Sequence, residues 1–164
     1  MVEVKIERLK KPDQETLEKL VAIYMRGYEG MREYGGEGER YARRYLRWCW
    51  DKAREGFFVA KFGDGIAGFI VCDDDWYSKY EGRVVGAIHE FVVDREYQGH
   101  GIGRKLMEKC LEYLADKDLI ELWVGEKNEK AIQFYRDYGF ERVGQSGIWV
   151  RMVRRKSDKG GESK

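Results

Sequence analysis

The chain has 164 residues, and its 31 Lys and Arg nearly balance its 30 Asp and Glu. This length predicts a single domain with its own hydrophobic core, and the balanced charge, which resembles a thermophile surface, argues against nucleic acid as a partner. Three widely spaced cysteines, two isolated histidines and the lack of a long apolar segment predict a cytoplasmic protein with free thiols, no metal and no membrane partner.

The first third of the chain predicts a strand and two helices. Residues 2–8 alternate apolar and polar side chains, as in a half-buried strand. Pro12 and Asp13 begin a helix, residues 27–38 form a glycine-rich loop, and a second helix covers about 39–55. We expect the aromatic side chains of the second helix to pack inward, although they could instead line a ligand pocket. These side chains are Tyr41, Tyr45 and Trp48.

Residues 57–82 predict two strands and a loop. The strands, over 57–62 and 66–72, flank the turn signal Gly63-Asp64-Gly65. Residues 73–82 are then expected to form a loop that opens with three consecutive carboxylates, Asp73 to Asp75. We interpret these as a solvated loop tip; the alternative is that they receive a cationic ligand together with the two aromatic residues that follow.

The segment from Val84 to Leu114 combines an apolar strand, a glycine loop and an amphipathic helix. The loop reads Gln98-Gly99-His100-Gly101-Ile102-Gly103. Glycines let a backbone adopt positive φ values and approach a ligand, and the unpaired amides of a helix N-terminus attract anions. Arg104 adds a cation in the first helical turn. The segment therefore predicts an anion site, most often used for phosphate, with a tight turn that binds no ligand as the alternative.

The rest of the chain completes the predicted fold. A buried strand is expected over 119–124, a helix capped by Asn128 and ended by Gly139 follows, and strands over 140–143 and 148–153 form a closing hairpin. We therefore expect one α/β domain over 1–154 with a mixed sheet, in the order β-α-α-β-β-β-α-β-α-β-β. Residues 155–164 are polar and glycine-rich, and we expect them to be a disordered tail.

Two motifs carry a family resemblance. Gln98-x-x-Gly101-x-Gly103 resembles the acetyl-CoA signature of the GNAT superfamily of N-acetyltransferases, and no P-loop or dinucleotide fingerprint fits the same glycines. Asn128-x-x-Ala131-x-x-Phe134-Tyr135, followed by Gly139-Phe140, resembles the second cofactor segment of that family. The resemblance implies a GNAT-like acyl-CoA N-acyltransferase fold. It also implies an enzyme that transfers the acetyl group of acetyl-CoA to a primary amine by direct attack in a ternary complex.

The resemblance also implies roles for individual residues. In this family pantetheine pairs with the edge of the central strand, and loop amides hold the pyrophosphate. The residues expected to bind acetyl-CoA are Phe91, Val92, Val93, Gln98, Gly99, His100, Gly101, Ile102, Gly103, Arg104, Asn128 and Tyr135. Tyr135 would in addition protonate the departing thiolate; the alternative is a core tyrosine on the inner face of its helix.

Glu90 is the candidate general base. It is a carboxylic acid within an apolar strand, where burial raises the pKa toward the range that deprotonates an amine. One alternative is that Glu90 pairs with an Arg or Lys inside the fold. Another is that His89, on the opposite face of a regular strand, is the base because a bulge reverses the two faces, and a water relay is a third.

The acceptor and the assembly are left open by the sequence. A protein N-terminus, a lysine, a polyamine or a small amine would each suit the chemistry, and a monomer or a homodimer is expected. The rival function is a non-catalytic acyl-CoA-binding or regulatory module that kept the loop without the chemistry. A nucleotide-binding protein is a further rival.

Overall fold

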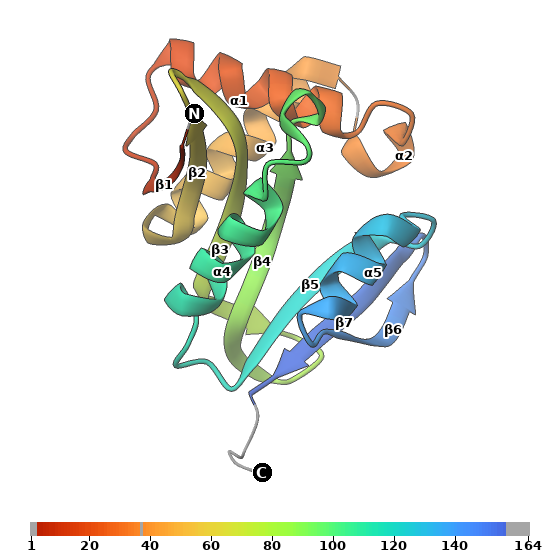
Figure 1. Cartoon of the computed structure of the whole chain (residues 1–164). Coiled ribbons are helices and arrows are strands. Elements are labelled where there is room, and N and C mark those ends of the chain that lie inside the picture. The colour runs from red at the N-terminus through yellow and green to blue at the C-terminus, as the bar shows by residue number, and fades with distance from the viewer. Residues whose placement is uncertain (1–2, 37, 157–164) are drawn as a thin grey trace. The chain divides into compact units, whose positions relative to one another are not determined.

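The computed structural model of the protein describes residues 3–36 and 38–156 (Figure 1). Its helices are α1 (Gln14–Gly27), α2 (Arg32–Gly35), α3 (Gly38–Lys52), α4 (Ile102–Tyr113) and α5 (Glu129–Asp137), with 3-10 turns η1 (Arg54–Gly56) and η2 (Arg95–Tyr97). Its strands are β1 (Val4–Arg8), β2 (Phe57–Phe62), β3 (Gly65–Ser78), β4 (Arg83–Val93), β5 (Leu119–Gly125), β6 (Glu141–Ser146) and β7 (Trp149–Arg155). No helix in this part of the chain is long and apolar enough to cross a membrane.

The described residues fall into two compact units, through both of which β3 and β4 run. The first unit combines Met1–Asp73 with His89–Tyr113, and the second combines Asp74–Ile88 with Leu114–Lys164. Neighbouring strands follow the order β1-β2-β3-β4-β5-β7-β6, a mixed sheet in which β4 pairs with β5 in parallel over Gly86–Ile88. The pairs β1–β2, β2–β3, β5–β7 and β7–β6 are antiparallel.

The first unit is built on helices that cover β1 and β2. Asp13 caps α1, because its carboxylate accepts a hydrogen bond of 2.8 Å from the Thr16 N–H, and this confirms the predicted helix start. Helix α1 packs against α3, and α4 contacts β1 and β2. The apolar faces of α1 and α3 meet the strands in a core that includes Leu20, Leu46 and Phe69. The same core includes Val92, so α1 and α3 pack close to β4.

The second unit pairs one helix with a three-stranded antiparallel layer. Helix α5 lies over β5 and β7 (Figure 1). Asn128 caps α5 by accepting a 3.3 Å hydrogen bond from the Ala131 N–H, and Gly139 follows the helix with a φ of +92°, both as predicted. Positive φ suits glycine because it lacks a Cβ atom. Ile132 and Tyr135 are the buried side chains of the helix, so Ile132 adds to the inner face that the sequence indicates.

Three local predictions differ from the structure. The loop prediction for residues 73–82 is wrong, because β3 continues through the carboxylates to Ser78. The predicted loop over 27–38 contains the one-turn helix α2. Strand β6 extends through Gly144 to Ser146, with an irregular register between Arg142 and Gly144, and the hairpin turns at Gly147, whose φ is +58°. Of the predicted tail, Arg155 ends β7, and residues 157–164 lie outside the described residues.

Candidate active site

Glu90 is a buried carboxylic acid in β4, with 8% of its surface exposed. The Tyr28 hydroxyl donates a hydrogen bond of 2.6 Å to Glu90 Oε2, and the Phe91 N–H lies 3.4 Å from the same oxygen. Burial raises the pKa of Glu90 to about 7, against the opposing effect of hydrogen bonds from Tyr28, Tyr45 and the Phe91 N–H. Among the described contacts its partners are therefore neutral donors, which disfavours the alternative of an internal ion pair.

A pocket of about 300 Å³ lies beside Tyr28 in the first unit. Its walls come from the end of α1, from α2 and from the first residue of α3, and they include Tyr24, Met25, Tyr28 and Arg32. Tyr24 donates its hydroxyl proton to the Gly35 carbonyl at 3.0 Å, which ties α1 to α2. Tyr28 both lines this pocket and donates to Glu90, so its side chain lies between the buried carboxyl and a space that can hold a small ligand.

The aromatic side chains of α3 differ in their exposure to solvent. Tyr45 is half-buried, packs 5.7 Å from Tyr24 between ring centroids, and donates to the His89 carbonyl at 2.8 Å. Tyr41 and Trp48 are 38% and 43% exposed. The predicted inward packing is therefore right for Tyr45, whereas Tyr41 and Trp48 are only partly covered. Both stack on the Tyr45 ring, and Trp48 also meets the ring of His89 in β4 edge-on at 5.1 Å between centroids.

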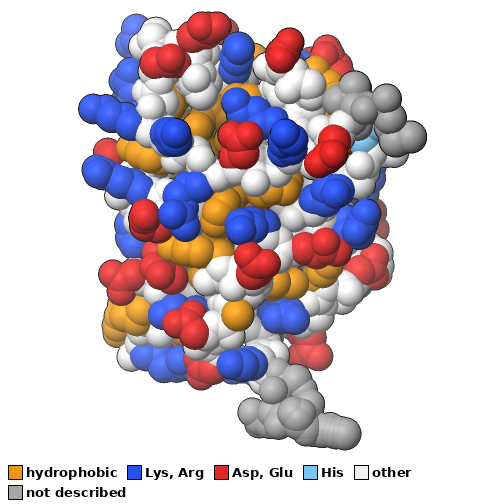
Figure 2. All heavy atoms as spheres, turned by 60° about the vertical axis from the view of Figure 1, so that its left-hand side comes forward, with side chains coloured by type: hydrophobic (Ala, Val, Ile, Leu, Met, Phe, Trp, Pro, Cys, Tyr) orange, Lys and Arg blue, Asp and Glu red, His pale blue; other side chains and the backbone are white. Residues whose placement is uncertain are grey.

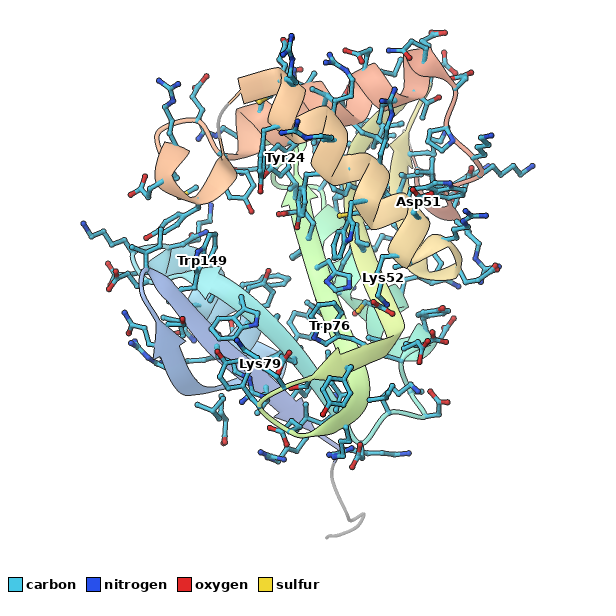
Figure 3. All side chains as sticks on the ribbon, turned by 180° about the vertical axis from the view of Figure 1, so that it is seen from behind. Tyr24, Asp51, Lys52, Trp76, Lys79 and Trp149 are labelled. Atoms are coloured by element: carbon cyan, nitrogen blue, oxygen red, sulfur yellow. The ribbon has the colours of Figure 1, made fainter. Side chains whose placement is uncertain are left out.

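His89, the neighbour of Glu90, has a separate set of partners. Its Nε2 lies 2.7 Å from Asp73 Oδ2, and that oxygen also accepts a 2.7 Å hydrogen bond from the Nζ of Lys52, at the end of α3 (Figure 3). Asp73 is only 2% exposed. It is thus neither part of a solvated loop tip nor open to a cationic ligand, because Lys52 and His89 already bind it. Asp74 and Asp75 are exposed on β3.

Asp94 fixes the start of the glycine loop directly after β4. It is 1% exposed and accepts hydrogen bonds from Arg26 Nη2 at 2.6 Å and from the Glu96 N–H at 3.2 Å. Burial opposes ionisation, but the hydrogen bonds from Arg26 and the Glu96 N–H lower the pKa of Asp94 overall. The ionised carboxylate therefore anchors turn η2 to the end of α1. This contact fixes the path of the chain from β4 into the glycine loop.

The glycine loop has the geometry of an anion site. Gly99 and Gly101 have φ values of +89° and +73°, which L side chains rarely adopt. The Lys105 N–H donates to the Gly101 carbonyl at 3.1 Å, so the amides of the preceding residues in the first turn of α4 have no acceptor within the helix. A Cβ atom at Gly99 would meet nothing within 4 Å. Open space, free amides and a first turn of α4 without an acidic residue fit a phosphate group.

The other residues predicted to bind the coenzyme in this loop lie around the two glycines. Gln98, Gly99 and His100 are exposed, and the His100 ring packs 4.8 Å from the ring of Phe62. Ile102 is buried and anchors the helix start. Arg104 lies 3.5 Å from Glu108 one turn later, with 59% of its side chain exposed. The contact with Glu108 therefore explains in part why an arginine stands in the first turn of α4. The other explanation is the anion site that the sequence predicts.

The end of β4 is held at close range by β3. Val92 is 6% exposed and belongs to the core of the first unit, whereas Phe91 and Val93 are half-buried. A Cβ atom at Gly68 would lie 2.7 Å from the Val92 carbonyl oxygen. Only glycine therefore permits β3 to approach this part of β4, and the backbone that is expected to bind pantetheine is tightly positioned from that side.

Tyr135 and Asn128 lie in the second unit. Tyr135 is 8% exposed on α5, and its ring makes edge contacts with Phe140 at 5.8 Å and Phe134 at 6.0 Å between centroids. Asn128 spends its side-chain oxygen on capping the same helix. The ring contacts match the core alternative for Tyr135.

Comparison with known proteins identifies the family. The model of the acetyltransferase (GNAT) family matches residues 17–140. The chain belongs to this family. It is 35% identical over 154 residues to an uncharacterized N-acetyltransferase of Methanocaldococcus jannaschii, a match that covers 93% of this chain and 68% of the relative.

The fold of the chain matches that of solved structures. A Pyrococcus horikoshii OT3 protein is 64% identical, covers 94% of this chain and 99% of its own, and has a TM-score of 0.88. The PaiA N-acetyltransferase of Thermoplasma acidophilum, crystallised with coenzyme A, has a TM-score of 0.73 at 19% identity and covers 94% of this chain and 99% of its own. These matches confirm the predicted α/β fold and an acetyl-CoA-dependent N-acetyltransferase.

Sequence reasoning missed several residues of this acetyltransferase site. Tyr28 is 62 positions from Glu90 and Tyr45 is 44 positions from His89, so no local pattern joins them. Arg26, the partner of Asp94, is 68 positions away from it. The one available signal was a tyrosine beside the glycine-rich segment after α1, because such segments often carry binding residues.

Proposed function

We propose that this acetyltransferase acts by direct attack of a primary amine on the thioester carbonyl, with Glu90 as the general base. The observation that carries the proposal is a carboxyl group that is buried, bound by neutral donors and raised in pKa to about 7. A base with that pKa is about half ionised at neutral pH, so it can accept a proton and later release it.

In the proposed site, acetyl-CoA is bound by the residues that the sequence predicts for it. Bound acetyl-CoA supplies the activated acetyl group. The amides of Gly99, His100, Gly101, Ile102, Gly103 and Arg104 would hold its diphosphate, since they lie in a loop with two positive φ values and in the first turn of α4. The Gln98 N–H donates to the Arg95 carbonyl at 3.4 Å, so Gln98 would contribute through its exposed side chain. Backbone groups of Phe91, Val92 and Val93 would orient pantetheine. Asn128 would contribute by fixing the first turn of α5.

The acceptor is proposed to enter the pocket beside Tyr28. Support comes from the volume of about 300 Å³ and from the contact that Tyr28 makes with Glu90. The acceptor is a primary amine, and a protein N-terminus, a lysine, a polyamine and a small amine remain the candidates. The alternative in which three adjacent carboxylates receive a cationic ligand loses Asp73, because Lys52 and His89 already bind it.

Tyr135 is the proposed acid that protonates the departing thiolate. Its phenol has the ordinary donor chemistry for this task, and the motif in which it lies is the second one that resembles the family. The edge contacts with Phe134 and Phe140 restrict the ring. A restricted phenol keeps one orientation, as a proton donor to a single sulfur atom requires.

The proposed setting is the cytoplasm, with the protein as a monomer or a homodimer. Three buried free cysteines support a reducing compartment. Nucleic acid is not proposed as a partner, since acidic and basic side chains alternate over the face seen in Figure 2 instead of forming a basic field.

The test is the pH dependence of acetyl transfer in Glu90→Gln. Rates would be followed by thiol release from acetyl-CoA with a panel of a short peptide, Nα-blocked lysine, spermidine and glucosamine. The wild type is expected to gain activity with an apparent pKa near 7, the pKa to which burial raises Glu90. Glu90→Gln should lose that rising limb and lower kcat/KM by roughly 100-fold to 10,000-fold.

Glu112→Gln is the matched control, because this exposed glutamate lies on α4 in the same unit and contacts Lys109. It should keep the wild-type profile. A rising limb that persists in Glu90→Gln at the same apparent pKa would assign the base to another group. Binding of acetyl-CoA, followed by calorimetry, should survive in both variants, which separates loss of chemistry from loss of the coenzyme.

A further inference from the structure

Tyr28 occupies a position that neither motif explains. It is the C-cap residue of α1, half-buried, and it lines the pocket. Its hydroxyl donates to Glu90 Oε2 at 2.6 Å, a usual length for a hydroxyl–carboxylate pair. Glu90 itself has only 8% of its surface exposed. Tyr28 is thus the residue that both lines the pocket and hydrogen-bonds the buried carboxyl.

We infer that Tyr28 is a catalytic proton relay, which carries the proton of the acceptor ammonium from the pocket to Glu90. The inference rests on the proposed role of Glu90 as base and adds a residue to it. The proposal also explains why a base could be buried: a carboxyl out of reach of the acceptor can still take its proton through an intervening hydroxyl.

The transfer balances without any further reactant. An N–H bond of the ammonium breaks as its proton passes to Tyr28 Oη, while the Tyr28 O–H bond breaks as its own proton passes to Glu90 Oε2. Tyr28 ends as a neutral phenol, as it began. The amine now has a free electron pair for attack on the thioester, and Glu90 is a neutral carboxylic acid. Passage in the reverse direction returns the proton to solvent after the product leaves.

The neighbouring tyrosines are committed elsewhere. Tyr24, which also lines the pocket, donates to the Gly35 carbonyl at 3.0 Å. Tyr45 also lies within hydrogen-bonding reach of Glu90, but its hydroxyl donates to the His89 carbonyl at 2.8 Å. The pocket lining includes Tyr24 and Tyr28. Of these two, Tyr28 is the one whose proton points at the carboxylate, so the geometry selects Tyr28 from the three tyrosines of the cluster.

The titratable groups that face Glu90 are neutral at physiological pH. From α1 and its cap these are Tyr24 and Tyr28, and from α3 they are Tyr45 and Cys49. Burial raises the pKa of Tyr24, Tyr45 and Cys49 above their usual values. Glu90 is therefore the group of this cluster that titrates near pH 7, and a pH profile in that range reports on it.

The experiment compares the pH profiles of Tyr28→Phe and the wild type with acetyl-CoA and the fastest amine of the panel above. Tyr28→Phe removes a donor to the carboxylate, so the rising limb should move to higher pH. The rate on the high-pH plateau should also remain at least tenfold below the wild type. If the plateau recovers to the wild-type rate, Tyr28 only adjusts the pKa of Glu90, and the relay is refuted.

Tyr24→Phe is the matched control, because it removes a hydroxyl from the same pocket that does not donate to Glu90. It can change KM, but its rising limb should stay at the wild-type position. Mixtures of H₂O and D₂O supply a second measurement on the intact protein. Two protons moving together give a curved dependence of kcat/KM on deuterium fraction, and a straight line for the wild type would overturn the relay.

Different results would overturn the proposal that Glu90 is the base and the proposal that Tyr28 is the relay. If Glu90→Gln keeps the rising limb, the base assignment is lost, and the relay is lost with it. If Glu90→Gln abolishes the limb while Tyr28→Phe retains the full plateau rate, Glu90 is the base and obtains its proton by another route. Binding of acetyl-CoA by Tyr28→Phe establishes that the variant is folded before its rates are compared.

Discussion

Among the described residues, each unit buries one glutamate in a strand, and the two glutamates have opposite kinds of partner. Glu90 in the first unit is 8% exposed and is met by tyrosine hydroxyls and a backbone N–H. Glu121 in the second unit is 3% exposed and meets a guanidinium: Arg151 Nη2 lies 2.6 Å and Nε 2.7 Å from its Oε1. Ser78 and Trp76 complete its hydrogen bonds at 2.7 and 3.0 Å.

The difference separates a structural carboxylate from a chemical one. A buried carboxylate that is paired with a guanidinium and fully hydrogen-bonded serves the fold, because removing either partner leaves the other buried without compensation. A carboxylate with only neutral donors pays the cost of burial when it ionises, and its pKa rises to about 7. Burial alone therefore does not mark a catalytic acid or base; the charge of its partners decides.

The largest effect on stability is expected when the structural pair is broken. Arg151→Met would leave Glu121 buried without a cation and would also remove the 2.8 Å contact from Arg151 to Glu81. The free energy of unfolding should fall by about 3–5 kcal/mol, because an unpaired buried charge keeps its full desolvation cost. Urea denaturation at pH 7 measures this loss.

The double variant Arg151→Met with Glu121→Gln is the control for that prediction. The glutamine amide can accept from Trp76 Nε1 through its single oxygen and donate to the Ser78 hydroxyl through its nitrogen, so the double variant should regain most of the stability. A loss of less than about 1 kcal/mol for Arg151→Met alone would mean that solvent reaches Glu121 and that the pair resembles a surface ion pair.

The chemical carboxylate should respond in the opposite direction. The pKa of Glu90 is raised in the folded state from an ordinary 4.5 to about 7. The stabilising effect of the bound proton on the fold is fully present below pH 4.5 and is lost as the pH rises to about 7. Above that pH, ionised Glu90 lowers the free energy of unfolding by roughly 3 kcal/mol relative to a neutral side chain. Glu90→Gln should therefore be more stable than the wild type by up to about 3 kcal/mol at pH 9 and nearly equal at pH 5.

Denaturation curves at pH 5, 7 and 9 check this prediction. Glu121→Gln provides the contrast, because removing the partner of Arg151 should lower stability at pH 9 instead of raising it. An equal difference between Glu90→Gln and the wild type at all three pH values would show that Glu90 does not titrate in this range, and the comparison of the two glutamates would collapse.

The sequence predicted the elements and the coenzyme loop because both depend on local patterns. The cap at Asp13, the turn at Gly63 to Gly65 and the glycines at 99 and 101 each act within a few residues, and all appear as expected. The strand extension through Asp73 was missed because polar composition favours a loop. Its burial depends on Lys52 and His89, which lie 21 and 16 positions away.

The partners of the two glutamates could not be read from the sequence for the same reason. Glu90 and Glu121 both stand in apolar strands, and no local feature distinguishes them. What differs is that Tyr28 reaches Glu90 across 62 positions, whereas Arg151 reaches Glu121 across 30. Its place in an apolar strand indicated Glu90 as a base, and the three-dimensional contacts give the physical reason why Glu90, and not Glu121, suits that role.

The smallest predicted effect concerns Tyr135, the one proposed catalytic group in the second unit. Tyr135→Phe keeps the ring that packs against Phe134 and Phe140, so stability should change little. Loss of the phenol should lower kcat by roughly tenfold to a hundredfold while acetyl-CoA still binds, given the usual contribution of an acid catalyst. Thiol-release kinetics and calorimetry measure both quantities. Unchanged turnover would make Tyr135 a core residue, and chemistry would then belong to the first unit while the second unit contributed structure.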